Sequence, residues 1–299
     1  MAESRAAGEQ AASGTPPSPT TSVLIVTRDR AGQLRRCLES LRTQSSPPFE
    51  VIVVDNGSSD ETSDVIRSYE ERLPVRYLFE PAPSIPRARN VALTQARGEV
   101  AVFIDDDCVA DPAWLDEARR ALAIHPHAVL VQGDVESRAR SVLGLALAVN
   151  SEVYFARHYF CADGGLRYAW SANLMVNPAA SPDPVRFDVR FRRSSDRELG
   201  ARLVRQGHEV AYHPAMRVVH AYDGVTLGGL LVRFFRNARL RDRSVSGLSF
   251  LRAVRDSLAD RGAVGMRAAG VIAATVLFLG AGAVGAAYAQ LLRALGRAT

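Results

Sequence analysis

The feature that most restricts the fold is a repeated alternation between short apolar runs and segments with helical spacing. Each run is five to seven residues long and is typical of a buried strand. After the first run, Leu34, Leu38 and Leu41 recur at helical spacing. Such alternation predicts an α/β fold with a mostly parallel, Rossmann-like sheet flanked by helices. The runs lie at 22–27, 49–54, 75–79, 100–104 and 128–134.

Polar residues follow three of these runs at the point where each strand is expected to end. Parallel α/β sheets bind ligands at the carboxyl ends of their strands, so these residues are expected to lie around one site. The candidate residues are Thr27, Arg28, Asp29 and Arg30 after the first run, Asp55 after the second, and Asp105, Asp106 and Asp107 after the fourth.

The acidic triplet in "FIDDDC" indicates a divalent cation. Three adjacent carboxylates repel one another unless a cation neutralises them, and oxygen ligands favour Mg²⁺ or Mn²⁺. In an extended backbone, Asp105 and Asp107 would point to the same side. The alternative is a solvated acidic turn before the next helix, which the triplet alone leaves open.

Asp55 also has two interpretations. A carboxylate can accept a strong hydrogen bond from an imide N–H, which uracil, thymine and guanine present and cytosine does not. The stretch Asn56-Gly57-Ser58 that follows is equally typical of a turn in which Asp55 bonds to its own backbone.

Several motifs in register resemble the inverting family-2 glycosyltransferases with a GT-A fold. The resemblance covers about residues 21–222. It is carried by "SVLIVTRDR", "VIVVDNGSSDET", "RARNVAL", "FIDDDCVADP", "WSAN", "SSDRELGARLVRQG" and the "VVH" at 218–220.

The resemblance implies a nucleoside-diphosphate sugar as donor and Mg²⁺ or Mn²⁺ as cofactor. Asp107, with Asp105 and His220, is implied to hold the metal. Trp170 and Asn173 are weaker candidates for contacts to the donor or acceptor sugar. The residues implied to bind the nucleotide sugar are Thr27, Arg28, Asp29, Arg30, Asp55, Arg89, Asp105 and Asp106.

Asp196 occupies the position of the catalytic base in this resemblance. The family usually has a second acid immediately before the base, and Ser195 stands there in this chain. Asp183 and Asp188 are alternatives, and an acid in the first turn of a helix is also favoured by the helix dipole alone. The implied reaction is inverting sugar transfer to a hydroxyl, with a glycan or lipid-linked molecule as acceptor.

The C-terminal part is expected to attach the enzyme to a membrane. Residues 223–267 form a basic, helical segment, and 268–292 contain no charged side chain. A helix of that length is ~37 Å long, enough to cross a ~30 Å hydrocarbon core. A buried helix is the alternative, because 13 of these 25 residues are Ala or Gly. The preceding Arg residues predict a single-pass protein of the cell membrane with a cytoplasmic catalytic domain.

The remaining composition restricts the function classes further. The net charge of +5 is concentrated in 230–267, so we expect no nucleic-acid partner. Cys37, Cys108 and Cys161 lack metal-ligand spacing and indicate buried thiols in a reducing compartment. Residues 1–20 are polar and are expected to be a disordered tail. Two alternatives to a glycosyltransferase remain, namely a nucleotidyltransferase and a non-catalytic scaffold that binds a nucleotide sugar.

Overall fold

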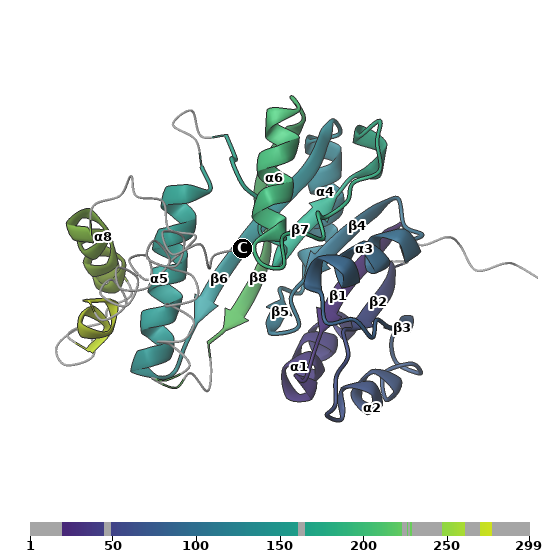
Figure 1. Ribbon diagram of the computed structural model, residues 1–299, viewed down its shortest axis with the longest axis horizontal. Coiled ribbons are helices and arrows are strands. Elements are labelled where there is room, and N and C mark those ends of the chain that lie inside the picture. The colour runs from purple at the N-terminus through teal and green to yellow at the C-terminus, as the bar shows by residue number, and fades with distance from the viewer. Residues whose placement is uncertain are drawn as a thin grey trace, which may run out of the picture.

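The computed structural model describes residues 20–44, 49–160, 165–222, 226, 228, 247–260 and 270–276 (Figure 1). The strands are β1 (Thr21–Thr27), β2 (Phe49–Asp55), β3 (Val75–Phe79), β4 (Val100–Ile104), β5 (Cys108–Ala110), β6 (Ala128–Arg138), β7 (Asn173–Val176) and β8 (Glu209–Ala221). The helices are α1 (Ala31–Arg42), α2 (Thr62–Arg67), α3 (Ile85–Gln95), α4 (Trp114–Ile124), α5 (Val142–His158), α6 (Ser195–Arg205) and α8 (Gly247–Asp260), with a 3₁₀ turn at Pro178–Ala180.

The strands form one sheet in the order β3-β2-β1-β4-β7-β6-β8-β5. The pairs among β1, β2, β3 and β4 are all parallel, and so is the pair β6–β8. This confirms the predicted mostly parallel α/β sheet. The predicted fifth strand, β6, does not lie beside β4, because the short β7 is inserted antiparallel to both.

A buried amide explains this insertion. Asn173, the first residue of β7, donates from Nδ2 to the backbone carbonyls of Asp134 in β6 (2.8 Å) and Met216 in β8 (2.7 Å). The two carbonyls lie at the irregularity in the β6–β8 pairing, where regular ladder hydrogen bonds are interrupted. Asn173 therefore satisfies backbone groups that the irregularity leaves without strand partners.

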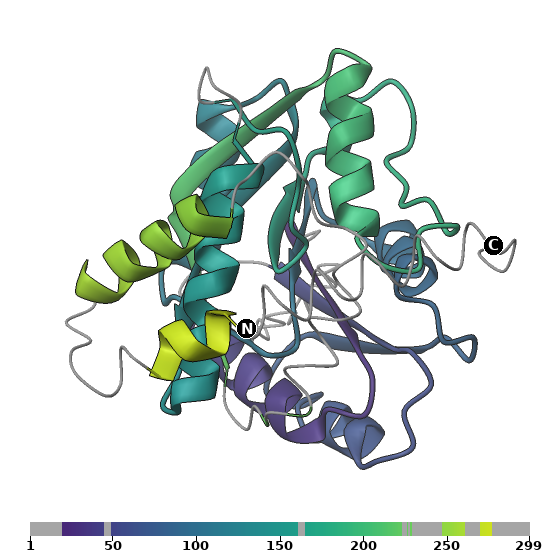
Figure 2. The same cartoon turned by 60° about the vertical axis from the view of Figure 1, so that its left-hand side comes forward.

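Helices cover both faces of the sheet because residues along the central strands alternate between two cores (Figures 1 and 2). Val23 and Ile25 of β1 pack in the core beneath α1 and α4, whereas Leu24 packs with α3 and α6 on the other face. The apolar residues of α1 recur at helical spacing and are buried, as the sequence predicts. The layers leave the ends of the strands as the accessible edges.

A buried polar network closes the edge of the sheet away from the acidic triplet. Glu50 accepts hydrogen bonds from Ser22 Oγ (2.7 Å), the Arg76 guanidinium (2.9 Å) and the Arg97 N–H (2.7 Å). Burial alone would raise the pKa of Glu50, but these hydrogen bonds outweigh burial and lower it below its ordinary value. The network joins β1, β2 and β3 to the loop between α3 and β4.

This edge gives a stability prediction. A Cβ at Gly98 would lie 2.6 Å from the Ser22 nitrogen and 2.7 Å from the Thr21 carbonyl carbon. Both atoms belong to the backbone of β1, so Gly98→Ala should lower the free energy of unfolding by ~1–3 kcal/mol. Urea denaturation followed by circular dichroism measures the change. Gly32→Ala is the control, because Gly32 lies in α1 with no atom within 4 Å of the added Cβ, and it should not destabilise.

The described C-terminal residues pack against α5. Val254 and Leu258 of α8, with Val271 and Ala274 of the helical segment 270–276, share an apolar cluster with residues of α5. Figures 1 and 2 show α8 beside α5, at the end of the sheet away from β3. The helical segment is also joined to α5 by a buried hydrogen bond of 2.9 Å from Asn150 Nδ2 to Thr275 Oγ1.

Within those described ranges, no helix combines the length and the apolarity needed to cross a bilayer. The predicted span, 268–292, lies outside the described residues except for 270–276, and most of the predicted basic segment 223–267 and of the tail 1–20 also lies outside them. The expected membrane segment therefore has no support from the described part of the chain.

Candidate active site

The carboxyl ends of β1, β2 and β4 meet at one edge of the sheet. Thr27, the last residue of β1, is the register partner of Asp55, the last residue of β2. β4 pairs with β1 on its other side, and the acidic triplet 105–107 follows it directly. The fold thus gathers a hydroxyl and several carboxylates from segments that are distant in the sequence.

The middle acid of the triplet joins two loops. Asp106 accepts a hydrogen bond from Thr27 Oγ1 (2.7 Å) and one from the guanidinium of Arg30 (2.9 Å). The same nitrogen of Arg30 lies 2.9 Å from Asp107 Oδ2. Burial raises the pKa of Asp106, although Arg30 opposes that change. Asp106 is therefore held inside the protein, and Arg30 neutralises part of the charge of the triplet.

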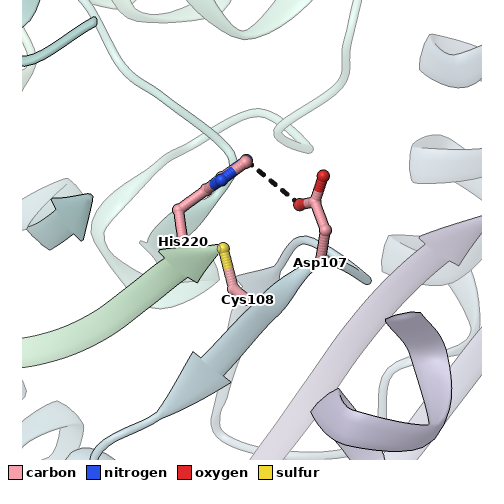
Figure 3. Close-up of side chains that lie close together, drawn as sticks. All are labelled: Asp107, Cys108 and His220. Carbon is pink, nitrogen blue, oxygen red and sulfur yellow. Dashed lines mark ion pairs between the residues drawn. The ribbon is translucent and has the colours of Figure 1, made fainter. Parts of the chain in front are cut away.

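Asp107 and His220 face each other across neighbouring strands (Figure 3). His220 Nε2 lies 3.1 Å from Asp107 Oδ1. The imidazole is 5% exposed and stacks on Tyr222, with ring centroids 4.3 Å apart. Its Nδ1 is buried and makes no hydrogen bond within the described residues. The ring is fixed by packing on one side and by the carboxylate on the other.

Cys108 completes a compact group of three potential ligands with Asp107 and His220. Its position follows from strand pairing, because Cys108 in β5 is the register partner of His220 in β8. Burial raises the pKa of the Cys108 thiol well above its ordinary value, which disfavours the thiolate form that binds a metal. Carboxylate and imidazole groups remain, and these suit Mn²⁺ or Mg²⁺ better than a soft metal.

Asp105 begins a turn rather than continuing the strand. The Cys108 N–H donates to the Asp105 carbonyl at 3.0 Å, so the extended backbone assumed for the alternation of Asp105 and Asp107 is absent. Burial, and next the charge of Asp107, raise the pKa of Asp105 to about 6. Such mutual repulsion between carboxylates is the condition that a bound cation relieves.

Asp55 bonds to the backbone of the turn that follows it, which was one of the two interpretations of its sequence. Its Oδ1 accepts the Ser58 N–H at 2.8 Å, and its Oδ2 accepts the Tyr77 hydroxyl at 3.2 Å. Asp55 is only 2% exposed. Each carboxylate oxygen has two acceptor positions, so these bonds leave capacity for an imide N–H.

Asp29 connects the loops that follow β1 and β2. Its Oδ1 accepts the Ser59 N–H at 2.7 Å, and this bond lowers the pKa of Asp29. Its φ of 51° lies in the left-handed region, which is uncommon for a residue with a Cβ. Arg28 is exposed and forms an ion pair of 3.5 Å with Asp29. Both residues lie in the loop beside the acidic edge.

Arg89 and Asp196 come together through Ser171. Arg89, in α3, donates one hydrogen bond to Ser171 Oγ and another to Ser195 Oγ (3.1 Å). Asp196 Oδ2 accepts from both the N–H and the Oγ of Ser171, each at 3.1 Å. Asp196 lies in the first turn of α6 and is 9% exposed. Arg89 also acts electrostatically on Asp105 of the acidic triplet.

The two sugar-contact candidates occupy different places. Trp170 is partly buried, with its ring 6.4 Å from that of His220. Asn173 is fully buried, and besides its two donor bonds it accepts Trp114 Nε1 at 2.9 Å. The structure thus places Asn173 in the core, with both amide hydrogens already used, whereas Trp170 borders the site.

The sequence profile described as glycosyl transferase family 2 matches residues 22–181. The chain belongs to glycosyl transferase family 2. The match includes β1 to β7 and hence Thr27, Asp55, the acidic triplet and Ser171, while Asp196 and His220 lie beyond its end. The predicted family is therefore confirmed.

Curated relatives share this family-2 region. The chain is 37% identical over 119 residues to validoxylamine A glucosyltransferase of Streptomyces hygroscopicus subsp. limoneus, covering 38% of this chain and 26% of that protein. It is 30% identical over 228 residues to O-antigen biosynthesis protein RfbC of Myxococcus xanthus, covering 68% of this chain and 17% of that protein. The chain thus spans about a quarter or less of the length of these relatives.

Solved structures share the fold at low sequence identity. Mannosyltransferase PcManGT from Pyrobaculum calidifontis, in complex with GDP-Man and Mn²⁺, has a TM-score of 0.60 at 18% identity, covering 91% of this chain and 88% of that one. S. aureus TarS 1-349 in complex with UDP-GlcNAc has a TM-score of 0.51 at 15% identity, covering 80% of this chain and 71% of that one. The GT-A-like fold of this family-2 domain is confirmed.

The sequence did not reveal four residues that shape the site of this family-2 domain. Ser171 was recognised only as part of "WSAN". Tyr77 lies in β3 and Tyr222 directly follows β8, and neither belongs to a motif. Gly200 was hidden within a helical pattern, although a Cβ there would lie 2.8 Å from the Tyr168 carbonyl carbon. The signal that could have found Ser171 is a small hydroxyl residue immediately beside the aromatic Trp170.

Proposed function

We propose that this family-2 domain transfers a sugar, with inversion, from a nucleoside-diphosphate sugar to a hydroxyl acceptor. The observation that carries the proposal is that Ser171 joins Arg89 to Asp196 by hydrogen bonds, while Arg89 also acts electrostatically on Asp105 of the acidic triplet. Inversion requires the acceptor hydroxyl to attack from the side opposite the leaving diphosphate. In this proposal the acidic triplet and Asp55 face the donor, and Asp196 faces the acceptor hydroxyl.

Asp196 is proposed as the general base. A carboxylate within reach of the acceptor hydroxyl takes its proton as the new bond forms, which contributes ~10²–10⁴ in rate. The hydrogen bonds from Ser171 hold the carboxylate in place. Ser195 stands where the family usually has a second acid, and it accepts a hydrogen bond from Arg89. Asp196 is therefore the acid of this pair that remains.

Mg²⁺ or Mn²⁺ is proposed as cofactor. Asp107 and His220, with Asp105 beside them, would hold it, and the raised pKa of Asp105 together with the clustered carboxylates fits a cation there. A bound divalent cation offsets negative charge that develops on the departing diphosphate. Arg30 adds a positive charge beside the triplet, because its guanidinium bridges Asp106 and Asp107.

The donor base is proposed to be uracil, thymine or guanine. Asp55 is buried at the strand end with acceptor capacity remaining, and an imide N–H is the group that fills it best. The solved neighbours in complex with UDP-GlcNAc and GDP-Man carry bases of this kind.

The acceptor is proposed to be a glycan or a lipid-linked molecule of the cell envelope. Support comes from the name of one relative, an O-antigen biosynthesis protein. Attachment to the cell membrane with the domain in the cytoplasm belongs to the same proposal and rests on the apolar sequence 268–292.

A donor screen tests the proposal. The purified protein is incubated with UDP-, dTDP-, GDP- and CDP-sugars, with Mn²⁺ or with EDTA, and release of nucleoside diphosphate is measured. We expect metal-dependent release from one or more of the first three donors and none from CDP-sugars. Efficient use of CDP-sugars contradicts the role of Asp55. Nucleotide binding without turnover across a broad acceptor panel supports the scaffold alternative, and release of pyrophosphate from a nucleoside triphosphate and a sugar phosphate supports a nucleotidyltransferase.

A further inference from the structure

Ser171 occupies an unusual position between a cation and the carboxylate of Asp196. It is 1% exposed and directly precedes the segment that leads into β7. Its Oγ accepts a hydrogen bond from Arg89 Nη2 and lies 3.1 Å from Asp196 Oδ2. Its backbone N–H donates to the same Asp196 oxygen, also at 3.1 Å.

The chemistry of these groups fixes the direction of each hydrogen bond. A guanidinium can only donate, so Ser171 Oγ must act as acceptor toward Arg89. The single hydroxyl hydrogen of Ser171 then remains for Asp196. Hydrogen bonds in which a partner is charged are about twice as strong as neutral ones. The row that runs from Arg89 through Ser171 to Asp196 has a charged group at each end. Arg89, Ser171 and Asp196 therefore form a polarised row of donors that ends on Oδ2.

The two oxygens of Asp196 consequently differ. Oδ2 accepts two hydrogen bonds from Ser171, whereas Oδ1 accepts the Arg197 N–H at 2.9 Å. A carboxylate oxygen offers about two acceptor positions, so Oδ2 is saturated and Oδ1 keeps one position. The oxygen that can receive a proton from an acceptor hydroxyl is thus Oδ1.

The backbone around Ser171 is packed closely enough to maintain this geometry. Gly200 of α6 lies against the backbone of Tyr168 and Ala169, where a Cβ would clash. Arg197 lies over the Tyr168 ring, 4.1 Å from its centroid. These contacts hold the first turn of α6 against residues 168–171, so that Ser171 and Asp196 cannot separate without moving the buried face of α6.

We propose that Ser171 is a positioning residue for sugar transfer. Ser171 holds the Asp196 carboxylate in one orientation and leaves an acceptor position on Oδ1 for the acceptor hydroxyl. Arg89 polarises the Ser171 hydroxyl, which in turn donates to Oδ2. This role rests on the proposed function, since it requires Asp196 to be the base, and it assigns to Ser171 a separate task beside that base.

The test combines Ser171→Ala with Asp196→Asn in the full chain. We expect Ser171→Ala to lower kcat roughly 10- to 100-fold, the rate equivalent of one hydrogen bond to a charged group. The affinity for the nucleotide sugar, measured by calorimetry, should stay within about twofold of wild type, because Ser171 acts on the base. In the Asp196→Asn background, Ser171→Ala should cause no further loss.

Three controls separate positioning from a general structural effect. Ser181→Ala removes an exposed hydroxyl that donates to the Asp183 carbonyl at 2.7 Å, and it should leave kcat unchanged. Ser171→Cys keeps the size of the side chain but donates weakly, so kcat should fall for this variant as well, even if Ser171→Ala fails to fold. Thermal unfolding of each variant verifies the fold.

Each outcome has a defined meaning. Unchanged kcat in Ser171→Ala or Ser171→Cys overturns the positioning role, and so does a loss that adds fully to that of Asp196→Asn. If the wild-type protein itself shows no transfer with any donor, the proposed function fails instead. Equal losses in kcat and in donor affinity would also contradict the proposal, because they would place Ser171 in the donor site.

Discussion

Asp196→Asn is expected to lower the rate of sugar transfer by about 10²- to 10⁴-fold while the nucleotide-sugar donor still binds. Asn has nearly the same shape and can still accept the hydrogen bonds from Ser171, but it cannot take a proton from the acceptor. The defect should therefore appear in kcat. Turnover with the donor found in the screen, beside calorimetric titration of the same donor, measures the two effects separately.

The two rival acids provide matched controls for this experiment. Asp188 is engaged by Arg190 at 2.6 Å, which together with the Arg190 N–H lowers its pKa to about 2, so it is a poor proton acceptor at neutral pH. Asp183 is exposed. Asp188→Asn and Asp183→Asn should both retain transfer. If Asp196→Asn retains full transfer activity, Asp196 is not the base. The same conclusion follows if transfer is lost in Asp188→Asn and not in Asp196→Asn.

The parallel half of the fold was predictable because its strands carry local signals. Runs such as 100–104 are apolar throughout, since both faces of a central strand are buried. The position of β7 was not predictable, because it depends on hydrogen bonds from Asn173 to two carbonyls that are distant in the sequence. The sequence shows the amide of Asn173, but it does not show the break in the β6–β8 pairing whose carbonyls accept its hydrogen bonds.

The candidate site was likewise predictable from the sequence only in part. Strand ends place Thr27, Asp55 and the acidic triplet at one edge, and that placement follows from topology alone. The orientation of each side chain does not. Asp105 and Asp107 would lie on the same side of an extended strand, but the backbone turns there, with the Cys108 N–H donating to the Asp105 carbonyl. The strand ends likewise do not encode that Asp106 accepts hydrogen bonds from Thr27 and Arg30.

Ser171 shows why the rest could not be predicted. Its contacts to Arg89 and Asp196 span 82 and 25 positions of the chain, and no local pattern encodes either of them. Only the packing of α6 against residues 168–171 brings the three together, and that packing depends on the absence of a side chain at Gly200. Buried polar contacts between distant segments are properties of the folded chain.

Asp107→Asn and His220→Ala are expected to abolish the linked binding of Mn²⁺ and the nucleotide sugar. Each change removes one ligand from a group of three, in which burial disfavours the thiolate form of Cys108; the nearby Asp106 is held by Thr27 and Arg30. Stabilisation of a developing diphosphate charge by a metal is worth several kcal/mol, so turnover should fall at least ~100-fold. Calorimetric titration of the donor with and without Mn²⁺ measures the linkage.

Both variants should remain folded, which separates a lost ligand from a lost structure. Arg30 keeps Asp106 as its partner when Asp107 is changed, and removing one carboxylate reduces the repulsion that raises the pKa of Asp105. Asp64→Asn, an exposed acid in α2, is the matched control and should preserve the linkage. Donor binding that depends on Mn²⁺ as strongly in Asp107→Asn as in the wild type would exclude the Asp107–His220 pair as the metal site and leave the acidic edge as a structural turn.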